Sequence, residues 1–472
     1  MGIKLGTSRS GWMSAVLATL LFVAAWLPWH PARPVLPTAD LYTHLSVARH
    51  LVRGEGFLND VTYPLSFAFP FAQALPQPLI NRQPGFSVVL TAPYLTAGRD
   101  PQRTLLHTRT LQLLFLGAIV LLGIRALQRH QRIFGVVPWF IILGTSPLLA
   151  FAVDWGFEEL LAGGLLLALW LRLRNGTKPS AADGVLWGIL ILFRLELFWV
   201  PLLWWLGRVC SRTTSPPIWR GVVLAAMVAL LVSSPWSIRN MRLTGHPFFT
   251  LQAQAELVKD TQNWPGYQVY RQLEPQPLLT VLRDDPVPSM RKAARGLKFF
   301  WRDSHRFFPP LLLLGLAYAT LRVLRRFRKK EGPSREDPAA PALSFLTLIA
   351  LCFQYAFFDH SLRHLLVLLP VLAWEVAYFV GLSWRHTAAA TIAVFLPFAQ
   401  LPGWQKAAQE AVAVEKTQPW LADREHIEES EIYFFEYSAG PWFLDRPGVW
   451  RSPAAEAKVP ALLLKNESVD PR

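Results

Sequence analysis

Apolar segments alternate with clusters of arginine and lysine along most of this chain, and this alternation limits its fold more than any other feature. A membrane-spanning helix needs about 20 predominantly apolar residues, and its cytoplasmic end carries an excess of Lys and Arg. The chain has 52% hydrophobic residues and a mean hydropathy of +0.27, which is more apolar than an ordinary soluble domain. The pattern therefore predicts an all-α polytopic membrane protein with sizeable polar loops.

The apolar segments predict about eleven transmembrane helices. They cover residues 12–29, 104–122, 133–153, 157–170, 182–193, 197–206, 222–234, 308–323, 342–358, 365–380 and 387–401. This arrangement places the N-terminus and nearly every arginine cluster in the cytoplasm, including the strongest cluster at residues 322–330. No small-residue cleavage site follows the first segment, so we interpret it as a retained helix and not as a signal peptide.

The stretch 182–206 has two interpretations, because Arg194 and Glu196 interrupt an otherwise apolar run. It could be one span that contains a buried Arg–Glu pair. We favour two short helices that meet at an outer turn, since this keeps the next arginine cluster on the cytoplasmic side. A structural ion pair and a ligand-binding role both remain open for the two charges.

The polar segments define the predicted domain organisation. A transmembrane domain over residues 1–402 contains a first outer loop at 30–103, with juxtamembrane helices, and a second long outer loop at 235–307. A small extracytoplasmic region follows at 403–472. The formal charge of +15 would suit a nucleic-acid partner. However, the basic residues fall mostly at the ends of apolar segments, so membrane topology explains them and no nucleic-acid partner is predicted.

The first outer loop contains the signals of a short helix. A Pro-Thr pair at 37–38 is typical of a helix start, apolar residues follow at helical spacing, and Gly54 is among the glycines that end the helix. We therefore expect an amphipathic helix on the membrane surface. Asp40 lies in its first turn, one turn before His44, where an acidic residue either complements the helix dipole or takes part in chemistry.

Charged residues also gather at the outer ends of several predicted helices. They are Asp40, Arg82, Asp154, Glu158, Glu159, Arg194, Glu196, Arg239, Asp359, His360, Arg363 and His364. A charge in mid-membrane costs at least about 2.5–3.5 kcal/mol, so such groups either line a polar cavity or lie solvated among the headgroups. For Asp154, Glu159 and His364 we favour the solvated position. His360 and His364 have the spacing of a metal pair, but two histidines alone do not define a site, and no structural metal is predicted.

Five segments share a pattern with a known group of enzymes. They are Asp40-Leu-Tyr42 with Ala48 and the GEGF of residues 54–57; Arg82-Gln-Pro-Gly-Phe86; Phe193-Arg-Leu-Glu196; Pro235-Trp-Ser-Ile-Arg239-Asn240 with Gly245-His-Pro247; and Asp359 to Pro370. In this order, over residues 12–402, they resemble the GT-C superfamily of polytopic glycosyltransferases, in particular protein O-mannosyltransferases and bacterial aminoarabinose transferases. Two positions depart from the pattern: Leu41 replaces a second acidic residue of the mannosyltransferases, and Leu195 replaces a proline.

The resemblance implies an inverting glycosyltransferase that uses a polyprenyl-phosphate sugar on the outer face of a bacterial inner (plasma) membrane. Asp40 matches the acidic residue proposed as general base for the acceptor hydroxyl. Arg82, Arg239 and Arg363 are candidates for the lipid phosphate, since guanidinium groups bind phosphate in a bidentate manner. Glu158 is a candidate for orienting the acceptor or the sugar. The other predicted substrate-binding residues are Tyr42, His44, Arg194 and Glu196.

The identity of the sugar, the acceptor and the need for a divalent cation stay open at this point. An envelope glycan, a membrane lipid or a protein could accept the sugar. Two other classes also remain. A lipid-linked sugar transporter or flippase would use the same charged cavity without covalent chemistry, although the sequence shows no internal repeat. A catalytically silent envelope-assembly subunit would not need Asp40 at all.

Overall fold

The fold was analysed in a computed structural model. It describes residues 9–26, 39–62, 66, 69, 71, 76–144, 146–175, 177–211, 217–259, 278–284, 286–307, 339–358, 360–381, 433–435 and 448–450. The predicted helices at 308–323 and 387–401, Asp359 and most of the region 403–472 lie outside these residues.

The described part of the chain is mostly helical. Its α-helices are α1 (Arg9–Trp26), α2 (Ala39–Val52), α3 (Gly85–Thr96), α4 (Pro101–Arg129), α5 (Val136–Gly144), α6 (Pro147–Trp155), α7 (Glu158–Arg174), α8 (Ala181–Phe193), α9 (Trp199–Ser211), α10 (Pro217–Thr244), α11 (Leu251–Val258), α12 (Leu278–Asp284), α13 (Pro286–Phe307), α15 (Ala339–Phe357) and α16 (Leu369–Val380). Three 3-10 helices join them: η4 (Ile133–Gly135), η5 (Leu195–Leu197) and η7 (Leu362–Leu368).

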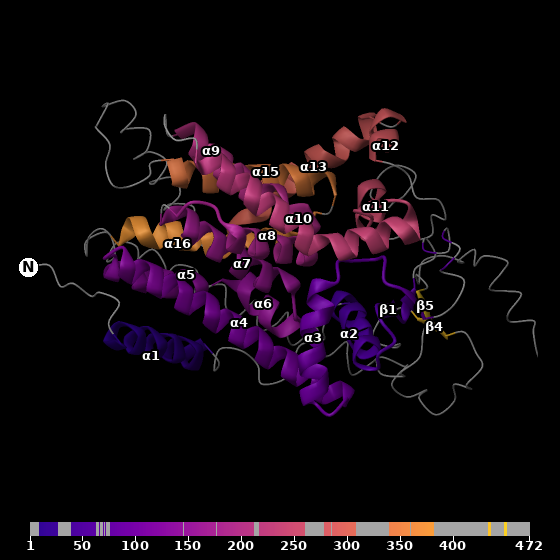
Figure 1. Cartoon of the computed structure of the whole chain (residues 1–472), viewed down its shortest axis with the longest axis horizontal. Helices are drawn as coiled ribbons and strands as arrows, with labels where there is room; N and C mark the ends of the chain where they lie inside the picture. The colour runs from indigo at the N-terminus through magenta and orange to yellow at the C-terminus, as the bar shows by residue number, and fades with distance from the viewer. Residues whose placement is uncertain are drawn as a thin grey trace, which may run out of the picture.

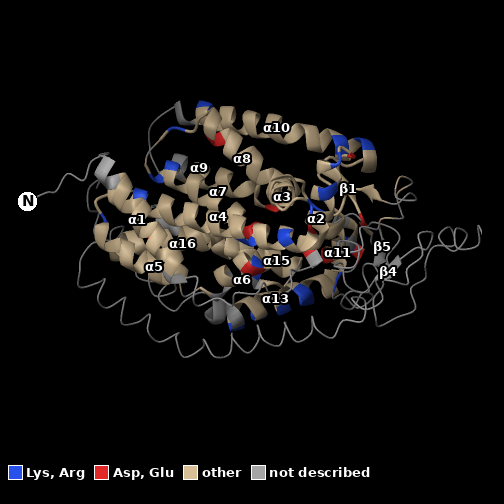
Figure 2. Ribbon diagram, turned by 90° about the horizontal axis from the view of Figure 1, so that it is seen from below, with Lys and Arg blue, Asp and Glu red and all other residues tan. Residues whose placement is uncertain are grey.

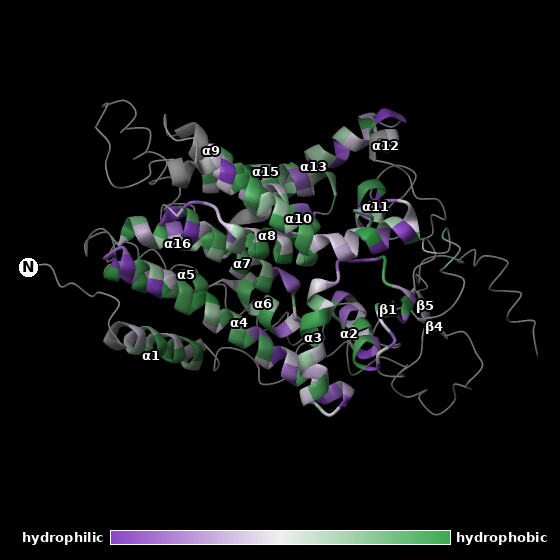
Figure 3. Ribbon diagram, viewed as in Figure 1, coloured by the Kyte–Doolittle hydropathy of each residue, from purple (hydrophilic) through white to green (hydrophobic). Residues whose placement is uncertain are grey.

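Apolar helices form a bundle, and the polar elements gather at one of its ends. Helices α1, α4, α5 and α16 run side by side, while α2, α11, α12 and the strands lie at the end opposite the N-terminus (Figure 1). Figure 3 shows the apolar residues concentrated along the bundle helices. Among the described residues, Pro101–Arg129, Trp219–Thr244 and Arg363–Val380 are long and apolar enough to cross a membrane, and six further apolar helices are shorter.

Two predicted helix boundaries are wrong. The segment 133–153 is not one helix, because α5 ends at Gly144 and Ser146 starts α6 by accepting a hydrogen bond from the backbone N–H of Leu149 at 3.4 Å. Pro147 occupies the first helical position, where a missing N–H is tolerated. The second outer loop does not begin at residue 235, since α10 continues through Pro235 to Thr244.

The part of α10 that precedes Pro235 packs closely against α8. A side chain at Gly184 would place its Cβ 2.5 Å from the carbonyl oxygen of Ala225, and one at Gly188 would lie 2.6 Å from the Cβ of Val232. The two glycines therefore let the helix backbones approach, as small residues do between membrane helices. At its other end, α8 stops at Phe193, and the prediction of two helices that meet at Arg194 is confirmed.

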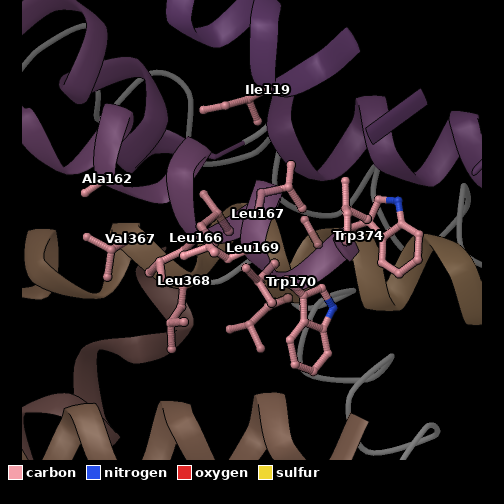
Figure 4. Packing of buried hydrophobic residues seen from close by; sticks show 14 of the residues in the cluster. Ile119, Ala162, Leu166, Leu167, Leu169, Trp170, Val367, Leu368 and Trp374 are labelled. Carbon is pink, nitrogen blue, oxygen red and sulfur yellow. The ribbon is translucent and has the colours of Figure 1, made fainter. Parts of the chain in front are cut away.

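The centre of the bundle is built around α7. Gly163 allows the ring of Pro370 and the carbonyl oxygen of Val367 to approach within 3.2 Å of the position of a Cβ. The surrounding apolar side chains interlock in Figure 4, where Ile119, Ala162, Leu166, Leu167, Leu169 and Trp170 lie near Val367, Leu368 and Trp374. This packing fixes the N-terminus of α7 beside η7, and both segments carry charged residues there.

Helix α2 is buried on all sides, and the expected surface position is therefore wrong. Every residue from 41 to 50 is buried. Its polar face finds partners within the protein, because Asp60 accepts hydrogen bonds from Ser46 at 2.8 Å and Arg49 at 2.6 Å and contacts the His50 ring at 2.8 Å. Burial alone would raise the pKa of Asp60, but His50 and Arg49 lower it below its usual value. Gly54 ends the helix segment with a positive φ of 78°.

Short strands connect the first outer loop to the C-terminal region. Strand β1 (Leu58–Asn59) pairs antiparallel with β3 (Gln77–Pro78). Strand β2 (Val61–Thr62) pairs in parallel with β5 (Gly448–Trp450), which also pairs with β4 (Tyr433–Phe435). The backbone of the C-terminal region is therefore hydrogen-bonded to the loop that carries α2.

Candidate active site

Asp40 lies between two arginine side chains that come from distant parts of the chain. Arg82 donates to one carboxylate oxygen of Asp40, and Nη2 of Arg363 lies 2.5 Å from the other. Arg82 follows β3, and Arg363 belongs to η7, so the first outer loop and the segment before α16 meet at this carboxylate. The side chain of Asp40 is 23% exposed, which leaves it accessible to a ligand.

The two guanidinium groups determine the charge of Asp40. Burial raises the pKa of a carboxyl group, but the charges of Arg363 and Arg82 outweigh burial and lower the pKa of Asp40 from 3.8 to about 2. The carboxylate is therefore ionised at neutral pH. It can accept a proton, although its low pKa makes it a weak base while both arginines remain in place.

A second, buried charge cluster lies next to Asp40. Glu158 and Glu159 form the first turn of α7, where the helix dipole favours negative charge. Arg194, which caps α8, lies with Nη1 at 2.8 Å from Glu158 and 3.1 Å from Glu159, and with Nε at 2.6 Å from Glu196. Figure 2 shows acidic and basic residues side by side near α2, α6 and α15.

Two histidines complete the buried cluster. His44 contacts Ser87 at 2.9 Å through Nδ1 and Glu158 at 3.3 Å through Nε2. Nδ1 of His364 lies 2.8 Å from Nη2 of Arg194 and 3.4 Å from Glu159. The shorter of these contacts is to the guanidinium group of Arg194, which can only donate. The His364 ring also stacks on Tyr355, with ring centroids 4.7 Å apart.

A cavity of about 350 Å³ opens beside these clusters. Its lining includes the charged side chains Arg82, Glu158 and Arg194, together with amide and carboxylate side chains on α11 and other segments. Those side chains are Asn81, Gln83, Gln252, Glu256 and Gln354, and Phe198, Phe248 and Phe358 provide aromatic surface. The volume lies in the range of small-molecule sites, and the few polar groups among apolar walls are typical of them.

The structure brings most of the predicted site residues together. Asp40, His44, Arg82, Glu158, Arg194, Glu196 and Arg363 form one continuous set of contacts. Tyr42 lies elsewhere, fully buried in the apolar cluster of α2 and α3 with Leu45 and Phe86. It does not line the cavity. Its side chain packs among these apolar residues, on the face of α2 opposite to Asp40.

Arg239, which is predicted to bind the phosphate, lies against the first outer loop. Nη1 donates to the backbone carbonyl of Leu79 at 2.8 Å, and Nη2 donates to that of Phe57 at 3.4 Å. The guanidinium group lies 4.4 Å from the ring centre of Trp236. Arg239 therefore fixes the first outer loop onto α10, and it lies outside the set of contacts around Asp40.

The solvated positions predicted for three other charges are wrong. Glu159 and His364 are almost fully buried and belong to the Arg194 cluster. Asp154 is also buried, and it pairs with Nε of Arg109 at 2.9 Å. Only the adjacent acidic pair at the start of α7 gave a sequence signal for Glu159. For His364 and Arg109, no local signal in the sequence identified their partners.

The carboxylates of the site do not fit a divalent cation in this arrangement. A hard cation takes several carboxylate and carbonyl oxygens as ligands. Here Asp40, Glu158 and Glu159 each face a guanidinium group. Within the described residues, no group of three or more His, Cys, Asp or Glu side chains could hold a metal ion.

Comparison with known proteins identifies the fold. The crystal structure of ArnT from Cupriavidus metallidurans bound to undecaprenyl phosphate matches with a TM-score of 0.56 over 98% of this chain and 89% of ArnT, at 13% sequence identity. This chain shares the fold of ArnT. The apo state of the same ArnT aligns over 98% of this chain and 88% of ArnT with a TM-score of 0.42 and 15% identity. No protein-family model and no curated protein sequence matches the chain.

The shared fold confirms the fold that the sequence resemblance implied. It also confirms a helical, integral membrane protein. The total of eleven transmembrane helices stays a prediction, because two of the predicted helices fall outside the described residues.

Proposed function

We propose that the protein is an inverting glycosyltransferase that moves a monosaccharide from a polyprenyl-phosphate donor to an acceptor hydroxyl. The observation that carries this proposal is the position of Asp40 between Arg82 and Arg363, next to the cavity of a GT-C fold. It places a general base beside two groups that suit a phosphate. The related ArnT structure holds undecaprenyl phosphate, which is a lipid carrier of the proposed kind.

In the proposed reaction, the acceptor oxygen attacks the anomeric carbon of the donor while its proton passes to Asp40. The new carbon–oxygen bond forms as the bond between the anomeric carbon and the phosphate oxygen breaks. Both electrons of that bond leave with the lipid phosphate, and its developing charge is stabilised by Arg82 and Arg363. Attack from the side opposite the phosphate inverts the anomeric centre.

The same two arginines couple donor binding to the basicity of Asp40. In the free protein they lie on the carboxylate and lower the pKa of Asp40 to about 2. A donor phosphate competes for these guanidinium groups. When it draws them away, the burial of Asp40 dominates and its pKa rises, which makes it a stronger base once the donor is bound. We therefore assign the arginines two roles, phosphate binding and control of the base.

The cavity suits the sugar part of the reaction. Amide and carboxylate groups such as Gln252 and Glu256 can hydrogen-bond sugar hydroxyls, and Phe248 and Phe358 offer faces on which a sugar ring can stack. Glu158 holds His44, Arg82 and Arg194 together at the cavity. Divalent cation chemistry is not part of this proposal.

We also propose an orientation in the membrane. The N-terminus lies in the cytoplasm and the site faces the exterior or periplasm of a bacterial inner membrane, as the arginine distribution predicts. The pairing of β5 with β2 supports placing residues 403–472 on the same side as the first outer loop at 30–103. The eleven-helix topology and the transmembrane domain over 1–402 belong to this proposal.

A transfer assay with membranes that contain the full chain tests the function. Radiolabelled polyprenyl-phosphate sugars are supplied one at a time, and label is followed into glycan, lipid and protein fractions. Asp40→Asn keeps the shape of the side chain but cannot take the proton, so transfer should fall at least about a hundredfold. Asp284→Asn, at an exposed position of α12, is the matched control and should transfer at the wild-type rate.

Each other outcome contradicts the proposal. Transfer at the wild-type rate by folded Asp40→Asn would exclude Asp40 as the base. Absence of transfer with a full panel of donors, combined with movement of intact lipid-linked sugar across sealed vesicles, would identify a flippase. An envelope defect that Asp40→Asn fully complements, without transfer or transport, would identify a silent assembly subunit.

A further inference from the structure

Helix α13 presents a basic and apolar surface that the proposed reaction does not use. At 100° per residue, its buried positions Ser289, Lys292, Ala293, Gly296 and Phe300 fall on one side. This side packs against α15 and η7. The opposite side is exposed along its length, and Figure 1 shows α13 at the edge of the bundle beside α15.

The packing of the buried side fixes which face α13 exposes. A Cβ at Gly296 would lie 2.7 Å from the Cα of Ala356, so the helix backbones are in close contact there. Nζ of Lys292 donates to the backbone carbonyls of Glu256 and, at 3.2 Å, Leu257, at the C-terminal end of α11. A cation at this position donates hydrogen bonds to carbonyls of the last turn of α11 and interacts favourably with the negative end of the helix dipole. Rotation of α13 would break these contacts.

The exposed side of α13 is divided into two parallel stripes. Val287, Met290, Ala294 and Trp301 follow one another at helical spacing and form the apolar stripe. Met290 is 61% and Trp301 87% exposed. Arg291, Arg295, Lys298 and Arg302 form the basic stripe beside it. The sequence contains no Asp or Glu from residue 286 to 302, and Asp303 follows on the same helix.

This division matches the chemistry of an anionic lipid surface. An interfacial helix places an apolar face among acyl chains and a basic face among headgroups, and Trp is enriched at that depth. Flexible Lys and Arg side chains can extend to headgroup phosphates while their methylene stems cover apolar surface. The protein is already held in a membrane, so the lipid competes for this face at high local concentration.

We propose that α13 is a docking surface for anionic phospholipid headgroups of the surrounding bilayer. The apolar stripe enters the acyl region, and Arg291 and Lys298 concentrate anionic lipid along the helix. Each basic residue close to a charged membrane surface contributes about fivefold to such enrichment. Because η7 carries Arg363 and packs on α13, bound lipid also supports the segment that holds Asp40.

Lipid-specific quenching tests the proposal with the full chain in nanodiscs. A fluorophore is attached to Ala294→Cys after the native cysteines are replaced by Cys210→Ala and Cys352→Ala. Nitroxide-labelled phosphatidylglycerol and phosphatidylcholine are compared as quenchers. We expect phosphatidylglycerol to quench several-fold more efficiently, and the difference should shrink as salt screens the charges.

Charge variants provide the controls. Arg291→Glu with Lys298→Glu should remove the preference for phosphatidylglycerol, and the neutral pair Arg291→Gln with Lys298→Gln should reduce it. Arg283→Glu, at an exposed position of α12, should leave it unchanged. Equal quenching by both lipids would overturn the anionic preference. Quenching by neither lipid would overturn membrane docking. If the fluorophore were then also shielded from aqueous iodide, a protein partner would cover this surface instead.

Discussion

Removal of Arg194 should destabilise the protein more than removal of any surface charge. Its guanidinium group contacts three carboxylates: Glu158 at 2.8 Å, Glu159 at 3.1 Å and Glu196 at 2.6 Å. Breaking a buried ion pair by removing one partner costs about 3–5 kcal/mol, because the remaining charge is left in a medium of low dielectric constant. We therefore expect Arg194→Met to lower the free energy of unfolding by about 3–5 kcal/mol.

The estimate depends on how well the two buried carboxylates are held by their other partners. Glu158 would keep His44 at 3.3 Å and Arg82 at 3.9 Å, and Glu159 would keep His364 at 3.4 Å and Arg363 at 3.7 Å. These distances are all longer than the contacts of the same carboxylates with Arg194, so these partners compensate only in part. A second substitution, Glu159→Gln, removes one of the unpaired charges. The double variant should recover at least about 1 kcal/mol relative to Arg194→Met.

Thermal unfolding of the purified full chain in detergent measures the effect. The matched control is Arg172→Met, which removes a guanidinium group from Asp183 in a more exposed pair. Asp183 keeps hydrogen bonds from the backbone N–H and the hydroxyl of Ser180 at 2.8 and 2.7 Å, so this variant should lose only about 1 kcal/mol. Equal stability of both arginine variants, or no recovery with Glu159→Gln, would refute the reasoning.

Three further predictions concern the base, the first outer loop and the packing of α3. Arg363→Gln should raise the pKa of Asp40 above about 2, because it removes one guanidinium charge while burial remains. Only the ionised base is active, so activity is lost as pH falls through this pKa, and the acid limb of log kcat/KM should move to higher pH. An unchanged acid limb would contradict this. Arg239→Met should speed proteolysis of the first outer loop, because two backbone carbonyls of that loop lose their hydrogen-bond donor. Loss of sugar transfer with an unchanged rate of proteolysis would instead support a role of Arg239 in phosphate binding. Gly85→Ala should lower the unfolding temperature and reduce the free energy of unfolding by about 1–3 kcal/mol, because its Cβ would lie 2.7 Å from a backbone oxygen of α8. The control Gly117→Ala, whose Cβ would have its nearest contact at 3.8 Å, should be neutral or stabilising.

Local signals in the sequence predicted the elements that depend on local physics. The helix around Asp40 was predicted from a Pro-Thr start and a glycine end, and α2 runs from Ala39 to Val52. The break between α8 and α9 was predicted from the charges at Arg194 and Glu196. In both cases capping residues or isolated charges interrupt the hydrophobic pattern, so neighbouring residues alone define the boundary.

Boundaries that depend on tertiary contacts could not be predicted in this way. Pro235 is a helix breaker by itself, but the hydroxyl of Ser234 donates at 2.8 Å to the carbonyl oxygen of Leu231, which the proline leaves without a backbone donor, and α10 packs closely on α8 ahead of the proline. These contacts let the helix continue past a residue that removes a backbone hydrogen bond. Likewise, the sequence of α2 is amphipathic and predicts a solvated polar face. The partner of that face is Asp60, which lies beyond the glycine turn, so its contacts with Ser46 and Arg49 could not be predicted from the helix itself.

The site residues also divide into those that a sequence pattern identified and those whose positions depend on tertiary contacts. Asp40 and Arg82 were identified by the motifs that resemble the GT-C superfamily, although no spacing rule joins residues 42 positions apart. Glu159 and His364 were expected at the headgroup level, because a charge at a helix end is ordinarily solvated. They are buried because the start of α7, the end of α8 and η7 converge, and only the folded chain brings these three points together.

The two charge clusters are joined through shared arginines, and this connection bears on catalysis. Arg363 contacts Asp40 at 2.5 Å and Glu159 at 3.7 Å, and Glu159 in turn shares Arg194 with Glu158. A phosphate that attracts Arg363 would therefore draw it from two carboxylates. Glu159 keeps Arg194 at 3.1 Å, whereas the other partner of Asp40 is Arg82, which the same phosphate attracts. Glu159 therefore stays neutralised while Asp40 does not, so the arrangement concentrates the change in basicity on Asp40.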